Sequence, residues 1–245
     1  MNLLSICRHR LLAAIIGVMA VIGGAHAAMN PVRNDADWLD AEGKPFTAQG
    51  GSLLKVGKFF YYYGMDGSFS NTVPWTVKCY SSTDLAIAEL SPDFSRIGRM
   101  VALIKDVKLE APSLFKRNGK YFFFASHVNW WYSSGTVWSS AERLEGPWSP
   151  FKPLLSPRPV EHPMARQMLR DSYNTQHDFV FRVSGSKGEF NLYCADRWTQ
   201  FSGYGRGNNV WLPLEFQGDV PVLDWHQAWW IDVENGTWSA VEASK

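Results

Sequence analysis

The sequence lacks the features that mark several common protein classes. It has three cysteines among 245 residues, too few for a disulfide framework, and no CxxC, HExxH or P-loop pattern. Its 24 basic and 23 acidic residues nearly balance, so composition does not point to nucleic acid as a partner. Beyond Ala27, no stretch is apolar enough to suggest a membrane segment, and none has a helical period. We therefore expect no metal, no cofactor and no nucleic acid.

Residues 1–27 have the pattern of a secretory signal peptide. Arg8 and Arg10 form a basic start, Leu11–Gly24 is apolar, and Ala25–Ala27 has the small-residue form of a cleavage site. The apolar run is short for a membrane span, although an N-terminal anchor is the alternative. We expect a secreted or periplasmic protein without contact to the membrane after cleavage, with 22 basic and 23 acidic residues in a single domain over 28–245.

The sequence is rich in aromatic residues, which make up 15% of the chain and recur in a repeated hairpin. Residues 52–63 read SLLKVGKFFYYY, residues 113–124 read SLFKRNGKYFFF, and a weaker copy, FVFRVSGSKGEFNLYCA, occupies 179–195. The matched turn glycines are nearly evenly spaced along the chain, at Gly57, Gly119 and Gly188. Recurrence at this spacing is typical of the blades of a β-propeller. The predicted class is all-β, and a two-layer β-sandwich is the alternative.

Short β-rich runs alternate with Gly, Pro, Asn and Asp turns from Thr47 onward. We predict strands at Gly51–Val56, Phe59–Gly64, Thr76–Ser81, Leu85–Leu90, Met100–Lys105, Ser113–Lys116, Tyr121–Ser126, Gly135–Ser139, Phe179–Val183, Phe190–Ala195, Val210–Phe216, Val222–Trp225 and Ala228–Val233. At about 65 residues per unit, the mature chain makes about three and a half blades, and propellers normally close with at least four. The prediction is therefore an incomplete propeller.

Several segments, in order, resemble glycoside hydrolase family 43, whose members are five-bladed propellers. AEGKPFTAQGGSLLKVGKFFYYYG and CYSSTDL resemble its first blade, and LEAPSLFKRNGKYFFFAS resembles a later one. NTQHDFVF, ADRW, VWLPLEF and the Trp-rich C-terminal run resemble its last blade and closure. The branch that looks most similar includes exo-acting 1,3-β-galactosidases. Together these segments cover most of residues 40–235.

The chain departs from this family at one junction. A CYSSTDL-like strand and an IAELS-like strand meet directly at Leu85–Ala86, where the family would have a second blade and most of a third. The missing stretch would also carry acidic residues that line the cleft in relatives. The resemblance therefore implies a family member with an internal deletion. Exposed blade edges would allow self-association.

Two residues are the predicted catalytic pair. Glu110 precedes an inner strand and matches the family position that looks like the general acid, which protonates the leaving oxygen. Its alternative is a surface carboxylate beside Lys105 or Lys108. For the base, the matching position is Gln176, which can only position water or react through an unusual tautomer. Asp178 is the alternative base.

Further residues are predicted to bind the sugar. Gln49 starts the first inner strand, and Asp66 follows the first aromatic strand, where a turn role is the alternative. The Trp130–Trp131 pair would offer a stacking platform, with Trp130 as the main candidate. Asp196 and Arg197 would hydrogen-bond hydroxyl groups, or form a structural ion pair.

The resemblance implies an exported glycoside hydrolase that acts on polysaccharide containing galactose or arabinose. The deletion motivates a second hypothesis, a catalytically inactive remnant that binds carbohydrate. A third is an export-associated scaffold without a sugar site. The sequence leaves open the sugar, the anomeric outcome, the oligomeric state and the pairing of Cys79 with Cys194.

Overall fold

Antiparallel β-strands dominate the part of the chain that the structure describes. The computed structural model describes residues 31–34, 36–39, 43, 49–57, 59–65, 85–90, 97–105, 107–129, 132–197 and 208–241. Val32–Lys245 forms one compact unit. The predicted signal peptide and the predicted strand at Thr76–Ser81 lie outside the described residues.

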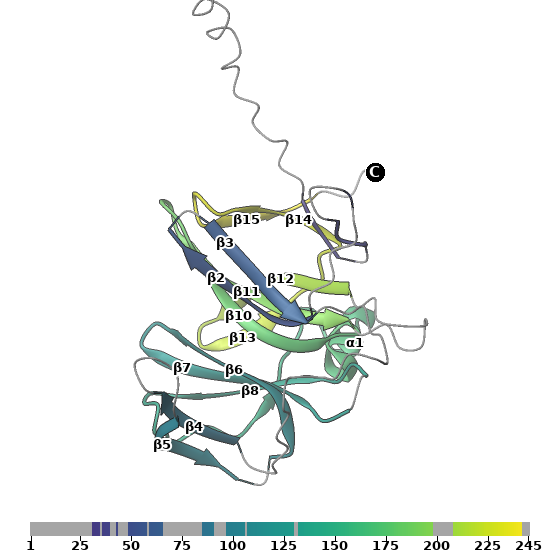
Figure 1. The fold of residues 1–245 in the computed structure, drawn as a ribbon. Coiled ribbons are helices and arrows are strands. Elements are labelled where there is room, and N and C mark those ends of the chain that lie inside the picture. The colour runs from purple at the N-terminus through teal and green to yellow at the C-terminus, as the bar shows by residue number, and fades with distance from the viewer. Residues whose placement is uncertain are drawn as a thin grey trace, which may run out of the picture. The chain divides into compact units, whose positions relative to one another are not determined.

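Two four-stranded sheets follow each other along the chain (Figure 1), with the orders β6-β7-β8-β9 and β10-β11-β12-β13. The strands of the first are β6 (Leu109–Arg117), β7 (Lys120–His127), β8 (Thr136–Ala141) and β9 (Lys152–Pro153). Those of the second are β10 (Gln176–Ser184), β11 (Glu189–Arg197), β12 (Asn208–Gln217) and β13 (Val220–Leu223). Each strand pairs with the next in sequence, which is the arrangement of a propeller blade.

The remaining strands form smaller sheets. β2 (Gln49–Val56) pairs with β3 (Phe59–Met65), and β4 (Leu85–Leu90) pairs with β5 (Ile97–Ile104). A three-stranded sheet has the order β1-β14-β15, from β1 (Val32–Arg33), β14 (Ala228–Asp232) and β15 (Thr237–Ala240). The first described strand thus pairs with β14, near the end of the chain.

The side chain of Asn34 holds the start of the described chain against its C-terminal part. Its Nδ2 donates hydrogen bonds to the carbonyl oxygens of Trp211 at 3.0 Å and His226 at 2.8 Å. Its Oδ1 accepts from the backbone N–H of Trp211 at 3.0 Å. Asn34 is 2% exposed, so these bonds are protected from water and tie β1 to the last four-stranded sheet.

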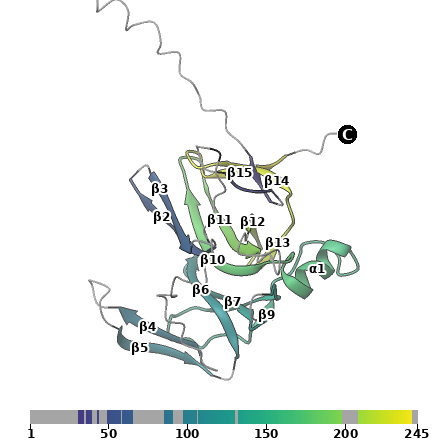
Figure 2. The ribbon, with the colours of Figure 1, turned by 45° about the vertical axis from the view of Figure 1, so that its right-hand side comes forward.

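The sheets pack in succession, and the alternation of side chains explains how. The sheet β6–β9 lies between the sheet β10–β13 and the hairpin β4–β5 (Figure 2). In β7, Phe122 and Phe124 pack toward β10–β13, while Phe123 and Ala125 pack toward β4–β5. The other face of β10–β13 packs against Trp229 of β14 and Leu53 of β2. Strands buried on both faces need near-continuous apolar runs, which is why the aromatic stretches lack a polar face.

One helix corrects the sequence analysis, which expected none outside the signal. α1 (Pro163–Asp171) begins at His162, whose side chain accepts a hydrogen bond from the backbone N–H of Met164, and ends at Ser172 in the left-handed conformation. Pro163 suits the first helical turn, because it lacks an N–H that would be unpaired there. Only Ala165 and Met168 are buried, which is too short a pattern to reveal a helical period.

Most other strand predictions are confirmed within the described residues, with ends that shift by at most four positions. The exceptions are β1, β9 and β15, which are short and were not predicted. Cys194 is a buried free thiol, and Cys79 lies outside the described residues. None of the described helices is both long and apolar enough for a membrane span.

Candidate active site

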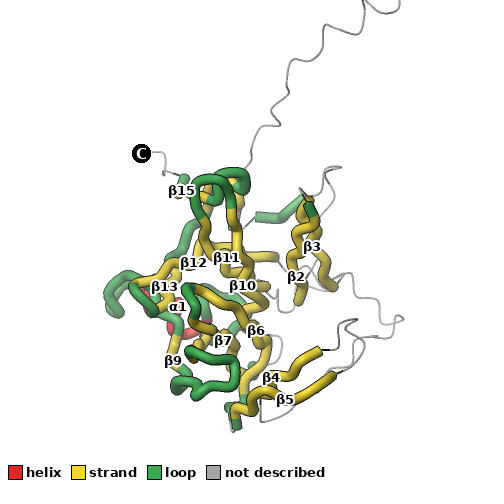
Figure 3. The backbone as a smooth tube through the Cα atoms, turned by 90° about the vertical axis from the view of Figure 1, so that its left-hand side faces the viewer, coloured by secondary structure: helices red, strands yellow, loops and turns green. Residues whose placement is uncertain are grey.

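The inner strands of three sheets begin with the same irregularity. The pairing register shifts between Gln49 and Ser52 in β2, between Glu110 and Ser113 in β6, and between His177 and Phe179 in β10. Such a bulge bends a strand and changes the direction of the side chains beside it. Three predicted site residues, Gln49, Glu110 and Gln176, therefore lie at equivalent ends of their strands. These strands are β2, β6 and β10, which Figure 3 labels.

The first two bulges share a backbone conformation. Gly50 follows Gln49 with a φ of 56°, and Ala111 follows Glu110 with a φ of 49°. The left-handed conformation suits glycine but strains alanine, because its Cβ meets the following carbonyl oxygen. Strain retained beside a site residue indicates that the surroundings hold it in place.

The structure brings Glu110 and Gln176 into direct contact, although 66 positions separate them. The Nε2 of Gln176 donates a hydrogen bond to Oε1 of Glu110 at 2.8 Å. The backbone N–H of Asn129 donates to the same oxygen at 3.2 Å. Both hydrogen bonds end on Oε1, so Oε2 is the oxygen that would carry a proton to a leaving group.

The turn before β10 is unusual. Ser172, Tyr173 and Asn174 follow one another with φ values of 51°, 63° and 60°. The Oγ of Ser172 accepts from the backbone N–H of Thr136 at 2.6 Å, which ties the turn to β8. Three consecutive left-handed residues end α1 and direct the chain into Gln176.

Asp178 and Asp196 form a carboxyl pair next to Gln176. Gln176 and Asp196 are directly opposite each other on β10 and β11, so their side chains share a face. Asp196 is fully buried and accepts a hydrogen bond from the backbone N–H of Gly50 at 2.5 Å. Burial raises the pKa of Asp196 to about 7. Burial, followed by the charge of Asp196 and a hydrogen bond to it, raises the pKa of Asp178 well above its usual range.

Tyr62 is a further partly buried polar residue close to the Asp178–Asp196 pair. The hydroxyl of Tyr62 on β3 donates to Oδ1 of Asn209 on β12 at 2.9 Å. Burial, followed by the charges of Asp196 and Asp178, raises the pKa of Tyr62, so the hydroxyl stays protonated. The hairpin β2–β3 is therefore joined to the last blade by polar contacts from Gly50 and Tyr62.

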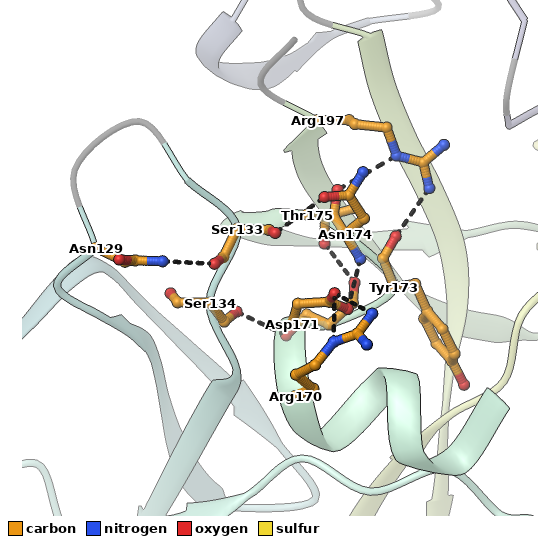
Figure 4. A network of polar contacts seen from close by, with 10 residues as sticks. Asn129, Ser133, Ser134, Arg170, Asp171, Tyr173, Asn174, Thr175 and Arg197 are labelled. Carbon is orange, nitrogen blue, oxygen red and sulfur yellow. Dashed lines mark hydrogen bonds and ion pairs between the residues drawn. The ribbon is translucent and has the colours of Figure 1, made fainter. Parts of the chain in front are cut away.

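Arg197 lies at the end of β11 and is fixed by backbone carbonyls. Its Nη2 donates to the carbonyl oxygen of Tyr173 at 2.8 Å, and its Nε donates to that of Asn174 at 3.3 Å (Figure 4). Its guanidinium lies over the ring of Trp225, 5.2 Å from the centroid. Successive side chains of a strand point to opposite faces, so Arg197 and Asp196 have different surroundings.

His177 lies behind the pair and is fully buried. Its ring lies 5.6 Å from the ring of Phe124 and 5.1 Å from that of Tyr193, between centroids. Neither nitrogen has a hydrogen-bond partner among the described residues. Burial lowers the pKa of His177 to about 3, so the imidazole is neutral at neutral pH and takes no charged part in the site.

Three other predicted residues are described only in part or not at all. The backbone of Gln49 is placed at the start of β2, but its side chain lies outside the described residues, as do Asp66 and Trp130. The residues that the sequence analysis missed are Asn129, Asn174 and Trp225, which surround Glu110, Gln176 and Arg197. Asparagine is common in turns of every kind, and Trp225 is one of 12 tryptophans in the chain. The sequence therefore gives no reason to single out these three residues as part of a site.

Metal ligation is not evident in the described part of the chain. No group of three or more His, Cys, Asp or Glu side chains there could hold an ion. The arrangement instead offers one accessible carboxyl group, one amide and a protonatable carboxyl pair, which suits proton transfer to and from a neutral substrate.

Comparison with known proteins identifies the fold. No family model matches the chain, and no curated protein matches it either. An exo-β-1,3-galactanase from Clostridium thermocellum is similar in structure, with a TM-score of 0.71 and 20% identity. An exo-β-1,3-galactanase from Phanerochaete chrysosporium with bound galactose gives a TM-score of 0.71 and 19% identity. A family 43 β-1,3-galactosidase gives 0.66 and 16%.

The lengths of these matches agree with missing blades. They cover 86%, 88% and 84% of this chain, but only 68%, 71% and 65% of the three enzymes. The prediction of an all-β, propeller-type fold with an incomplete set of blades is thereby confirmed. The chain has the fold of the family 43 glycoside hydrolases, reduced in its number of blades.

Proposed function

We propose that this protein is an exported glycoside hydrolase that removes galactose units from a β-1,3-linked galactan. The contact between Glu110 and Gln176 carries the proposal, because two residues from different blades meet at equivalent strand ends. The activity of the structural neighbours supports it: they are exo-β-1,3-galactanases and β-1,3-galactosidases.

Each residue of the site takes a role that its chemistry allows. Glu110, through Oε2, protonates the oxygen of the leaving sugar. Gln176 has no proton affinity as a neutral amide, so it positions the attacking water. Asp196 has a pKa near 7, which suits a group that accepts the proton of that water at neutral pH. Asp178 is less buried and hydrogen-bonds to Asp196, so it connects that buried group to the site.

The contact must open before catalysis. At 2.8 Å, Gln176 and Glu110 leave no space for water between them. In an inverting glycosidase, the acid and base lie about 6.5–9.5 Å apart to admit water. Gln176 hydrogen-bonds to Glu110 and lies opposite Asp196, so it separates the acid from the proton acceptor.

One observation favours a second function, a sugar-binding protein without turnover. Within the described residues, β2–β3 and β4–β5 are two-stranded sheets where complete blades would have four. Family resemblance also implies that the absent blades carry cleft acids. A site that lacks them would hold sugar with Glu110 and Gln176 and fail to cleave it.

An assay with a matched variant separates these functions. The purified protein is tested on β-1,3-galactan and on aryl β-galactosides, beside Glu110→Gln, which preserves size and hydrogen bonding. Loss of a general acid lowers kcat by about 10²–10⁴-fold, so that loss is expected for the variant on galactan. Galactose binding without hydrolysis by either protein would support the sugar-binding function. Hydrolysis that survives in Glu110→Gln would remove Glu110 from the mechanism.

A further inference from the structure

The inner strands β2, β6 and β10, labelled in Figure 3, each have a basic residue at the same position. It lies six positions after the predicted site residue at the start of the strand: 49 to 55, 110 to 116 and 176 to 182. These three residues, which we call the basic cluster, are Lys55, Lys116 and Arg182. Six positions of a strand span about 20 Å. The basic cluster therefore lies at the end of the inner strands that is far from the contact between Glu110 and Gln176.

Contacts between the sheets bring the members of the basic cluster near one another. The Nη2 of Arg182 donates a hydrogen bond to the carbonyl oxygen of Lys116 at 2.6 Å. The Nζ of Lys55 lies over the ring of Phe60, 5.2 Å from its centroid. That ring meets the ring of Phe181, next to Arg182, edge to face, with 6.2 Å between centroids. Three sheets thus contribute one cation each to the same end of the inner strands.

The positive charge of the basic cluster is mostly not neutralised by acidic residues. All three side chains are exposed. Lys55 and Lys116 form no ion pair with any residue that the structure describes. Arg182 has Glu189 at 3.7 Å, and both side chains are about half exposed, so this ion pair is weak. Cations without acidic partners raise the local concentration of anions.

Aromatic rings accompany two of these cations. Phe60 lies directly opposite Lys55 on the neighbouring strand, and Tyr121 lies directly opposite Lys116. The Nζ of Lys116 is 4.6 Å from the centroid of the Tyr121 ring, and the ring of Phe60 is 37% exposed. Cations bind carboxylates by charge-assisted hydrogen bonds, while an exposed ring offers an apolar face to the C–H groups of a sugar. The combination suits a sugar polymer that carries carboxylates.

We propose that the basic cluster binds an acidic polysaccharide with uronic acid units, at a site separate from the candidate active site. Packed sheets lie about 10 Å apart, so one cation per sheet suits a chain with several charges better than a single small ion. The choice of a polysaccharide among polyanions rests on the proposed function, whereas the site itself does not depend on catalysis. Binding there holds the protein on an acidic polymer and leaves the other end of the inner strands free for galactan.

Surface plasmon resonance on immobilised polygalacturonate tests the proposal, at low and at physiological ionic strength. The triple variant Lys55→Gln, Lys116→Gln, Arg182→Gln removes the charges, and the double variant Lys55→Arg, Lys116→Arg keeps them. Lys152→Gln is the matched control. Lys152 is also exposed and lies over an aromatic ring, 5.5 Å from the centroid of Trp138, but it belongs to the outer strand β9.

The parent protein should bind polygalacturonate, and more weakly as the ionic strength rises, because salt screens exposed charges. The triple variant should bind about tenfold more weakly, from a loss of about two- to threefold for each exposed ion pair. The arginine variant and Lys152→Gln should bind as the parent does. Circular dichroism should show the same fold for all of them. Hydrolysis of neutral β-1,3-galactan should not change in the triple variant, since the basic cluster lies at the other end of the strands.

Equal binding by the triple variant and the parent, or no binding by the parent, would overturn the proposal. Duplex DNA or anionic vesicles that bind as tightly as polygalacturonate, with the same dependence on the basic cluster, would overturn the assignment to a polysaccharide. A protein that hydrolyses galactan but does not bind polygalacturonate would keep the enzyme and reject this site. A protein that binds polygalacturonate through the basic cluster but hydrolyses nothing would uphold this site and reject the enzyme.

Discussion

The sheet β6–β9 has a different neighbour on each face, and the two interfaces differ in completeness. One face packs on a four-stranded blade, with Phe122 and Phe124 meeting Tyr193 and Leu212. The other packs on the hairpin β4–β5, which contributes Ile87 as a buried contact. A four-stranded blade covers the whole face of the sheet beside it, whereas a two-stranded hairpin covers only part of that face. The contact between Glu110 and Gln176, the candidate active site, lies on the complete side.

The largest expected effect comes from removing one ring on each face. Phe124 is fully buried between the two blades, and its ring lies 5.2 Å from that of Phe115. We expect Phe124→Ala to lower the free energy of unfolding by about 3–5 kcal/mol, because it leaves a cavity in a rigid core. Phe123→Ala should cost less, about 2–3 kcal/mol, because the hairpin can move into the space.

Urea unfolding of both variants and of the parent measures this difference. Equal losses would show that the hairpin supports its face as firmly as the complete blade does. The comparison is clean, because Phe123 and Phe124 are adjacent residues of the same strand with similar burial.

A pH-dependent effect should follow within the complete blade. Asp178 and Asp196 have raised pKa values when folded, so above about pH 4 the folded state binds more protons than the unfolded state. Their contribution to stability is full below about pH 4 and is lost as the pH rises through about 7. The slope is about 1.4 kcal/mol per pH unit for each proton retained.

Asp178→Asn removes one of these protons and the repulsion between the pair. We expect it to raise the unfolding free energy by roughly 2 kcal/mol at about pH 8 and to leave it nearly constant at about pH 4. Asp219→Asn is the control, because that exposed carboxylate pairs with Lys120 on the surface and should have little effect. Thermal unfolding across this pH range measures the effect, and an equal shift at both pH values would argue against raised pKa values for Asp178 and Asp196.

The strained bulge next to Glu110 predicts a smaller change. Ala111 has a φ of 49° where β2 has glycine at a φ of 56°. We expect Ala111→Gly to raise the free energy of unfolding by about 0.5–1 kcal/mol through relief of this strain. Gly50→Ala should lower it by a similar amount, since a Cβ there meets nothing within 4 Å and the cost is that of the backbone alone. Denaturant curves that move both variants in the same direction would contradict the equivalence of the two bulges.

The sequence was sufficient to predict the blades and the convergence of Glu110 and Gln176, the proposed catalytic pair. A hairpin with a turn glycine recurs at a nearly regular spacing, which indicates blades. Glu110 and Gln176 lie at the starts of matching strands, and the blades of a propeller bring such positions together. The turn over Ser172–Asn174 was not predictable, because serine and tyrosine carry no signal for the left-handed conformation and asparagine carries only a weak one.

The outward face of the hairpin predicts the smallest effect. Met100 is 56% exposed and Leu103 is 40% exposed on β5, while Val101 and Ala102 between them pack inward. Because water already covers these two side chains, lysine at both positions should change the unfolding free energy by less than about 0.5 kcal/mol. Ile87→Ala, on the inward face, should instead cost about 2 kcal/mol or more.

Self-association remains a prediction, and the same lysine variant addresses it. Apolar residues at the edge of an incomplete sheet favour contact with a second chain, and charge opposes such contact. Sedimentation velocity over a range of protein concentrations should show less association for Met100→Lys with Leu103→Lys than for the parent. If the variant instead loses stability as strongly as Ile87→Ala does, these side chains contribute to the fold itself, and the hairpin is as well supported as the complete blade.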